Sequence, residues 1–141
     1  MKLFLDANVL FTASYSPEGR AGALFDLADA GCCFLCTSAF ALEEARRNFA
    51  LKAPAKLSGL EHILPLVTIV PEPSPDKVTW AQGLPLPVKD APIMAAAVVC
   101  AADILVTGDR RDFGHLFGQS IEGVRVMSPR EALGEVLKGV S

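Results

Sequence analysis

The chain has 141 residues, which is long enough for one domain with a core of its own and too short to suggest two. Its formal net charge of −3 argues against a nucleic-acid binder that depends on overall charge, although an acidic pocket filled by metal can coexist with basic patches on its rim. The longest apolar run, 91–102, is well below the ~20 residues of a membrane span, and the first residues lack a signal-peptide pattern. We therefore expect one cytoplasmic domain over residues 1–141, without membrane association.

The hydrophobic pattern predicts strands that alternate with helices. Strands are expected at 2–5, 32–36, 66–70, 104–107 and 124–127, and helices at 8–13, 22–30, 38–51, 54–64, 91–102 and from 129 onward. The last helix has a clear start, because Ser128 to Glu131 form a capping box with proline at the first helical position. The segment 71–87 contains five prolines and leaves room for one turn around 76–81. The alternation predicts an α/β protein, a three-layer α/β/α sandwich with a central parallel sheet of four to five strands.

The four cysteines are expected to be small core residues. Cys33 and Cys36 have the spacing of a C-x-x-C motif, but in a strand they point to opposite faces of the sheet. No second pair or nearby histidine completes a zinc-binding set, so the sequence predicts no metal site there.

Four acids fall at comparable positions in this topology. Asp6 closes the first strand, and Glu44 lies in the second turn of the helix after the second strand. Asp90 begins the apolar helix, and Asp109 follows the fourth strand. All four can reach one cleft at the carboxyl edge of a parallel sheet. Carboxylates ~5 Å apart repel each other by about 3 kcal/mol per pair at an effective dielectric constant near 20, so we expect a cation among them. Mg²⁺ or Mn²⁺ fits best, because these motifs contain no histidine or cysteine.

Each acid also has a plainer interpretation. Asp90 taken alone is better explained as a helix N-cap, and Glu44 as a solvated surface residue. Asp6, Asp109 and Asp112 have the positions of ordinary turn or cap residues. Four acids at equivalent ends of the elements nevertheless favour a shared site.

Helical geometry distinguishes Glu43 from Glu44. Glu43 lies on the outer side with Arg46 and has Arg47 as its i+4 partner, a common surface pair. Glu44 lies instead beside the apolar stripe of its helix, so we choose Glu44 as the candidate ligand.

The motifs around these acids resemble those of PIN-domain ribonucleases, the fold of many bacterial and archaeal toxin nucleases of toxin–antitoxin pairs. The resemblance covers nearly the whole chain and rests on LDANVL at 5–10, Ser38 followed by Glu44, KDAPIMAAA at 89–97 and VTGDRRDF at 106–113. It implies a metal-binding quartet of Asp6, Glu44, Asp90 and Asp109. Asp112 matches a further acid of the last motif, and the sequence leaves open which of Asp109 and Asp112 touches the ion.

The same resemblance implies supporting residues and partners. Asn8 and Thr107 match positions whose small polar side chains hold the acids by hydrogen bonds, and we place Ser38 with them. A homodimer and an inhibitory antitoxin are the partners that the family suggests.

The leading hypothesis is therefore Mg²⁺- or Mn²⁺-dependent hydrolysis of single-stranded RNA. The basic residues available to hold the RNA backbone from the rim are Arg46, Arg47, Lys52, Lys89, Arg110 and Arg111. A second hypothesis keeps the fold without catalysis, as an RNA-binding or partner-binding module. A third is another Mg²⁺-using protein, either a phosphatase or a phospho-receiver. The phosphatase requires Asp-x-Asp after the first strand, where Asn8 stands instead, and the receiver requires an acid pair near that strand and a phosphoacceptor on the third, which are not seen.

Overall fold

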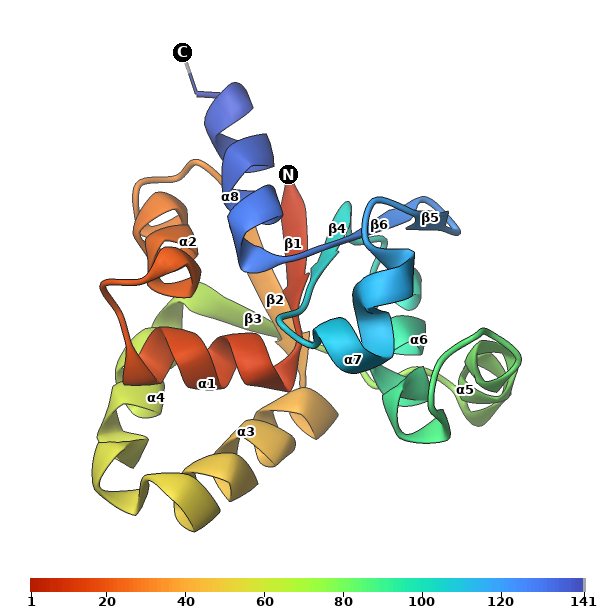
Figure 1. Cartoon of the computed structure of the whole chain (residues 1–141), viewed down its shortest axis with the longest axis horizontal. Coiled ribbons are helices and arrows are strands. Elements are labelled where there is room, and N and C mark those ends of the chain that lie inside the picture. Colours follow the sequence, from red (N-terminus) through yellow and green to blue (C-terminus); the bar gives the residue numbers. More distant parts are fainter. Residues whose placement is uncertain (141) are drawn as a thin grey trace.

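The computed structural model describes residues 1–140 and places six strands in one sheet, in the order β3-β2-β1-β4-β6-β5 (Figure 1). The strands are β1 (Lys2–Leu5), β2 (Phe34–Ser38), β3 (Val67–Val70), β4 (Ile104–Val106), β5 (Ser120–Ile121) and β6 (Val124–Met127). Neighbouring strands are parallel except β5 and β6, which form an antiparallel pair. The sheet is therefore mixed and has one strand more than expected, because the two residues of β5 are too few to show a hydrophobic pattern.

Helices connect and cover the strands. The α-helices are α1 (Ala7–Tyr15), α2 (Arg20–Asp29), α3 (Ala39–Lys52), α4 (Leu57–Ile63), α5 (Pro75–Gln82), α6 (Ala91–Val99), α7 (Arg110–Phe113) and α8 (Pro129–Lys138). Single 3₁₀ turns lie at Pro54–Lys56, Leu64–Leu66, Val88–Asp90 and Gly114–Leu116. None of the helices in residues 1–140 combines the length and the hydropathy that traversing a bilayer requires.

Alternation along β1 divides the core between the two faces of the sheet. Leu3 and Leu5 pack with side chains of α1, α2, α4 and α8, whereas Phe4 packs with side chains of α6 and α7. Figure 1 shows α1, α2 and α4 on one side of the sheet and α6 and α7 on the other. The predicted three-layer α/β/α architecture is confirmed.

The structure contains two helices that the sequence did not predict in full. The proline-rich segment contains a full helix, α5, which Ser74 caps by accepting a hydrogen bond from the Lys77 N–H and which has Pro75 at its first position. The prediction allowed only one turn there. The polar segment after β4 also contains a short helix, α7.

Two of the four cysteines, Cys33 and Cys36, are buried in the core as predicted, whereas Cys32 and Cys100 are partly buried and pack against it. Cys33 packs in the cluster with Leu3, and Cys36 packs on the opposite face with Phe4. All four are free thiols.

Candidate active site

The site lies where the direction of strand addition reverses. From β1 the chain proceeds to β2 and β3 on one side, and it then crosses to β4 on the other side of β1. In an open parallel sheet this switch point leaves a crevice beyond the carboxyl ends of the strands. Asp6 follows β1 and Thr107 follows β4, so the chain delivers polar side chains to both sides of the crevice.

A pocket of about 310 Å³ occupies this crevice, and we call it the acidic pocket. The acids that line it are Asp6, Glu44, Asp90 and Asp109, together with Ala7, Asn8, Asn48, Lys52 and Lys89. The structure thus brings all four acids of the predicted quartet to one place. Glu43, the alternative to Glu44, is exposed and does not line the pocket.

A hydrogen-bond network holds Asp6 at the centre of the site. Its Oδ1 accepts a bond of 2.7 Å from the Ala7 N–H and so caps α1, while its Oδ2 accepts a bond of 2.9 Å from the Thr107 hydroxyl. Asn8 donates from Nδ2 to the Asp6 Oδ2 at 3.3 Å and accepts from the Gly108 N–H at 2.8 Å. Asn8 and Thr107 therefore tie the end of β1 to the end of β4, the supporting role that the resemblance implied.

Asp90 is the acid that most directly indicates a cation site in the acidic pocket. It is buried at the N-cap position of α6, but its side chain makes no capping hydrogen bond, so helix capping does not account for this carboxylate. Its Oδ2 is buried and has no hydrogen-bond partner among residues 1–140. A buried carboxylate oxygen without a partner is costly, and here it calls for a cation.

Burial and mutual repulsion shift the titration of the two most enclosed acids. Desolvation raises the pKa of Asp90 to about 7, with a further increase from the charge of Asp6 and a decrease from Lys89. Desolvation also raises the pKa of Asp6 to about 6, against the lowering effect of the hydrogen bonds from Thr107 and the Ala7 N–H. Both carboxylates are therefore held in a site that resists their negative charge.

The last motif contributes two acids with different surroundings. Asp109 caps α7 by accepting a hydrogen bond of 3.0 Å from the Asp112 N–H. Carboxylate oxygens of Asp90, Asp109 and Asp112 all lie within 4.8 Å of one another. Lys89 Nζ lies 3.1 Å from Asp112 and holds the pKa of that carboxyl below its ordinary value. The structure places both Asp109 and Asp112 within reach of an ion, so the choice between them stays open.

The donor set fits a hard divalent cation. The candidate ligands are carboxylate oxygens, and the pocket contains no histidine or cysteine among its lining residues. Such a set suits Mg²⁺ or Mn²⁺. A cation would also partner Asp90 Oδ2 and favour the ionised forms of Asp6 and Asp90. The acidic cluster is thus a possible metal site.

Several predicted residues lie outside the acidic pocket. Ser38 is buried and caps α3 by accepting from the Ala41 N–H, so it positions the helix that carries Glu44. Arg46 pairs with Glu61 at 3.4 Å, away from the acids. The remaining arginines predicted to hold RNA are exposed, and none of them lines the acidic pocket: Arg47, Arg110 and Arg111.

Asn48 is a lining residue that the prediction did not name as part of the site. It follows Glu44 by four positions and precedes Lys52 by four, so one face of α3 supplies all three side chains. Helical spacing from Glu44 is the signal that would have identified it.

These features together define an α/β protein with a cluster of carboxylates at the switch point of a largely parallel sheet. The sequence matches the PIN domain family over residues 2–111, and the chain belongs to that family. No curated protein matches the sequence.

Solved structures share the fold at low sequence identity. PAE2754 from Pyrobaculum aerophilum is 17% identical with a TM-score of 0.70, and the match covers 98% of this chain and 99% of that one. VapBC2 from Rickettsia felis, solved bound to a DNA fragment from its promoter, is 20% identical with a TM-score of 0.63 over 91% of this chain and 98% of that one. FitAcB from Neisseria gonorrhoeae is 24% identical with a TM-score of 0.59 over 91% and 98% of the two chains.

Proposed function

We propose that this protein is a metal-dependent endoribonuclease that hydrolyses phosphodiester bonds of single-stranded RNA. The observation that carries the proposal is the partnerless buried Oδ2 of Asp90 in a pocket that Asp6, Glu44 and Asp109 also line. A site that concentrates negative charge in this way is suited to an ion and, through the ion, to a phosphate. Membership of the PIN domain family, whose members are typically nucleases, supports the same conclusion.

The carboxylates would hold Mg²⁺ or Mn²⁺, with Asp6, Glu44, Asp90 and Asp109 as ligands and Asp112 as a further one. A bound ion of this kind activates water and stabilises the charge that develops in an in-line displacement at phosphorus, which leaves a 5′-phosphate and a 3′-hydroxyl. The Thr107 hydroxyl and the Asn8 amide orient the Asp6 carboxylate, and the bond from Thr107 favours its ionised form against the effect of burial. Lys89 balances the charge of Asp112 at the rim of the pocket.

The direct test is cleavage of an end-labelled single-stranded RNA by the purified protein with Mn²⁺ and with EDTA. We expect cleavage only with the metal, and strong loss of it on Asp90→Asn. Asp29→Asn is the matched control, because Asp29 is an exposed acid on α2 outside the pocket. Calorimetric Mn²⁺ binding without any cleavage would favour the silent binding module instead. Cleavage that persists in EDTA would contradict the proposal.

We further propose an inhibitory protein partner and a homodimer, so that the nuclease is the toxin of a toxin–antitoxin pair. The structural relatives support this, since they include VapBC and FitAB assemblies. Coexpression with the product of the adjacent open reading frame should yield a complex that no longer cleaves RNA, and light scattering should give twice the chain mass for the free protein. Light scattering that gives the mass of one chain would contradict the homodimer. RNA cleavage by the coexpressed complex would contradict the inhibitory partner.

A further inference from the structure

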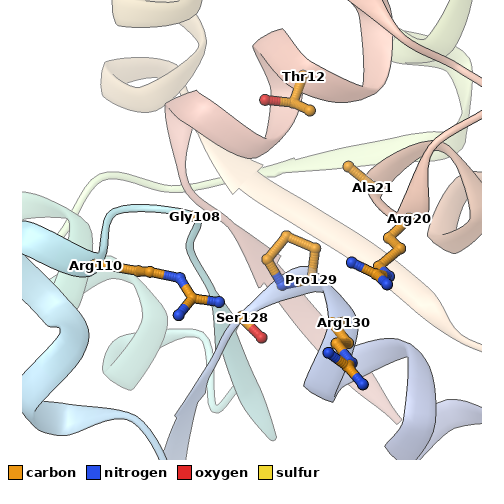
Figure 2. A pocket seen from close by; sticks show the side chains of 8 residues that line it. All are labelled: Thr12, Arg20, Ala21, Gly108, Arg110, Ser128, Pro129 and Arg130. Atoms are coloured by element: carbon orange, nitrogen blue, oxygen red, sulfur yellow. The ribbon is translucent and has the colours of Figure 1, made fainter.

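A second pocket lies beside the acidic one and has the opposite charge. It encloses about 330 Å³, and we call it the arginine pocket because Arg20, Arg110 and Arg130 line it together with Gly108 and Ser128 (Figure 2). Figure 2 shows Arg110 and Arg20 on either side of Ser128 and Pro129, with Arg130 beside them. These arginines come from three separate elements, α2, α7 and α8.

No carboxylate within residues 1–140 forms an ion pair with any of these three arginines. The ion pairs of the described chain use Arg46, Lys89, Arg125 and Lys138 instead. Three unpaired guanidinium groups around one pocket, in a chain of net charge −3, form a local field that attracts anions. Arginine is also the side chain best suited to bidentate contact with phosphate.

The placement of two of these arginines is unfavourable for the fold alone. Arg20 and Arg130 occupy the first and second positions of α2 and α8, next to the partial positive charge of each helix N-terminus. The Gly19 cap of α2 supplies no side-chain acceptor for the first N–H groups. An anion in the pocket would relieve this accumulation of positive charge.

The segment that joins β4 to α7 separates the two pockets and contributes to both. Asp109 lines the acidic pocket, whereas its neighbours Gly108 and Arg110 line the arginine pocket. A strand that has one phosphate at the carboxylates and continues across Gly108 would therefore pass from the acidic pocket to the arginine pocket.

We infer that the arginine pocket binds a backbone phosphate of the RNA strand that flanks the bond to be cleaved. This inference rests on the proposed ribonuclease function. It assigns the path of the bound RNA strand, which runs from the acidic pocket across Gly108 to the arginine pocket. Arg20, Arg110 and Arg130 are positioning residues here, and they contact the substrate away from the reacting atoms.

The test measures RNA binding separately from cleavage. A fluorescent single-stranded RNA with hydroxyl groups at both ends is titrated in EDTA by anisotropy at several salt concentrations, with wild type and the Arg20→Ala/Arg130→Ala double variant. The double variant loses the contact to this phosphate, which should lower the salt slope of the association constant by about 0.7 and the affinity by about fivefold at 0.1 M salt. Arg125→Ala is the matched control, because Arg125 is paired with Glu135 and lines neither pocket.

The outcomes separate this inference from the proposed function. Equal affinity and salt slope for the double variant and Arg125→Ala would overturn the arginine pocket while leaving cleavage untouched. A defect that appears only with a 5′-phosphorylated RNA would also overturn it, since the pocket would then read a strand end. Weak binding by the double variant together with no Mn²⁺-dependent cleavage by wild type would overturn the ribonuclease proposal and leave the phosphate site standing. Both arginines are exposed and lie beside helix N-termini, so the melting temperature of the variant should not fall, and its measurement controls for misfolding.

Discussion

The acidic pocket and the arginine pocket are similar in size, about 310 and 330 Å³, yet they differ in charge and in burial. Asp6 and Asp90 are buried and resist ionisation, whereas Arg20, Arg110 and Arg130 are exposed to water. Burial makes the carboxylates of the first pocket costly to leave without a cation, whereas the arginines of the second remain accessible to water. The difference fits the division of work that we propose, with the chemistry at the carboxylates and the positioning of substrate at the arginines. The predictions below test this division.

The largest effect is expected from Asp6→Asn. The change removes a candidate metal ligand at the centre of the network, and the several kcal/mol that a bound ion contributes correspond to a loss of about 10³-fold in kcat. RNA affinity in EDTA should be unchanged, because the arginine pocket is intact. Single-turnover cleavage and anisotropy on the same preparation check both statements. A parallel fall in binding would mean that the two pockets do not act separately.

A pH-dependent effect on stability should follow from the buried acids when metal is absent. The pKa values of about 6 for Asp6 and about 7 for Asp90 lie above the ordinary 3.8, so the folded protein retains protons that the unfolded chain has released between about pH 4 and 7. The folded state should therefore gain stability as the pH falls through 7 and 6. The full gain for Asp6 alone is on the order of 3 kcal/mol, of which about half develops between pH 8 and pH 5.

Urea unfolding in EDTA at pH 8, 7, 6 and 5 measures this gain. The Asp6→Asn/Asp90→Asn double variant lacks both titrating groups, and the difference between its unfolding free energy and that of wild type isolates them. At pH 8 the free energy of unfolding of wild type should be lower than that of the double variant, and this difference should shrink as the pH falls. A difference that grows toward pH 5 would show that the buried carboxylates are stabilising when ionised.

A smaller effect is expected from Thr107→Val. The hydroxyl donates to the Asp6 Oδ2 and accepts from the Asp109 N–H at 3.1 Å. Its removal leaves the Asp109 N–H without this partner and the Asp6 Oδ2 with only the longer bond from the Asn8 amide, at a cost of about 1–2 kcal/mol. The pKa of Asp6 should rise further, and the pH profile of Mn²⁺-dependent cleavage should move to higher pH. Thr107→Ser retains the hydroxyl and should restore the wild-type profile. If valine and serine gave the same profile, the hydrogen bond would have no part in tuning Asp6.

The smallest effect is expected from Lys89→Gln. Lys89 carries a positive charge beside the acids, and removing it should tighten Mn²⁺ binding by up to about fivefold, the range of exposed ion pairs. Calorimetry of Mn²⁺ binding measures the change, and Lys138→Gln is the control for loss of one charge. Weaker Mn²⁺ binding by Lys89→Gln would show that the lysine organises the acids.

The acidic pocket could be predicted because each of its acids follows a recognisable local signal. Asp6 ends a buried strand, Asp90 precedes an apolar helix, and parallel strands bring such ends to one edge. Even so, the burial of the Asp90 oxygen depends on packing around α6, and no local pattern shows it. A serine followed by proline predicts the start of α8 at Ser128-Pro129. The same pair occurs at Ser74-Pro75, but the many prolines around it argue against a regular helix there, so the sequence does not predict α5 in full.

The arginine pocket could not be predicted from the sequence in the same way. Arg20 and Arg130 are exposed residues 110 positions apart, and only the packing of α2 against α8 brings them together. The sequence predicts Arg110 to hold RNA, but Arg20 stands in no motif, and Arg130 lies in a capping box, which indicates a helix start and not a phosphate site. Charged surface residues carry little positional signal on their own, because most of them are simply solvated.

The pairing of β1 with β4 has a consequence for synthesis on the ribosome. The two strands are adjacent in the sheet, but about a hundred residues of chain separate Asp6 from Thr107 and Asp109. Translation supplies residues in order from the N-terminus, so a nascent chain that ends before β4 has only part of the carboxylate set. Under the proposed ribonuclease function, the full carboxylate set can therefore assemble only after β4 has emerged from the exit tunnel, late in the synthesis of the chain.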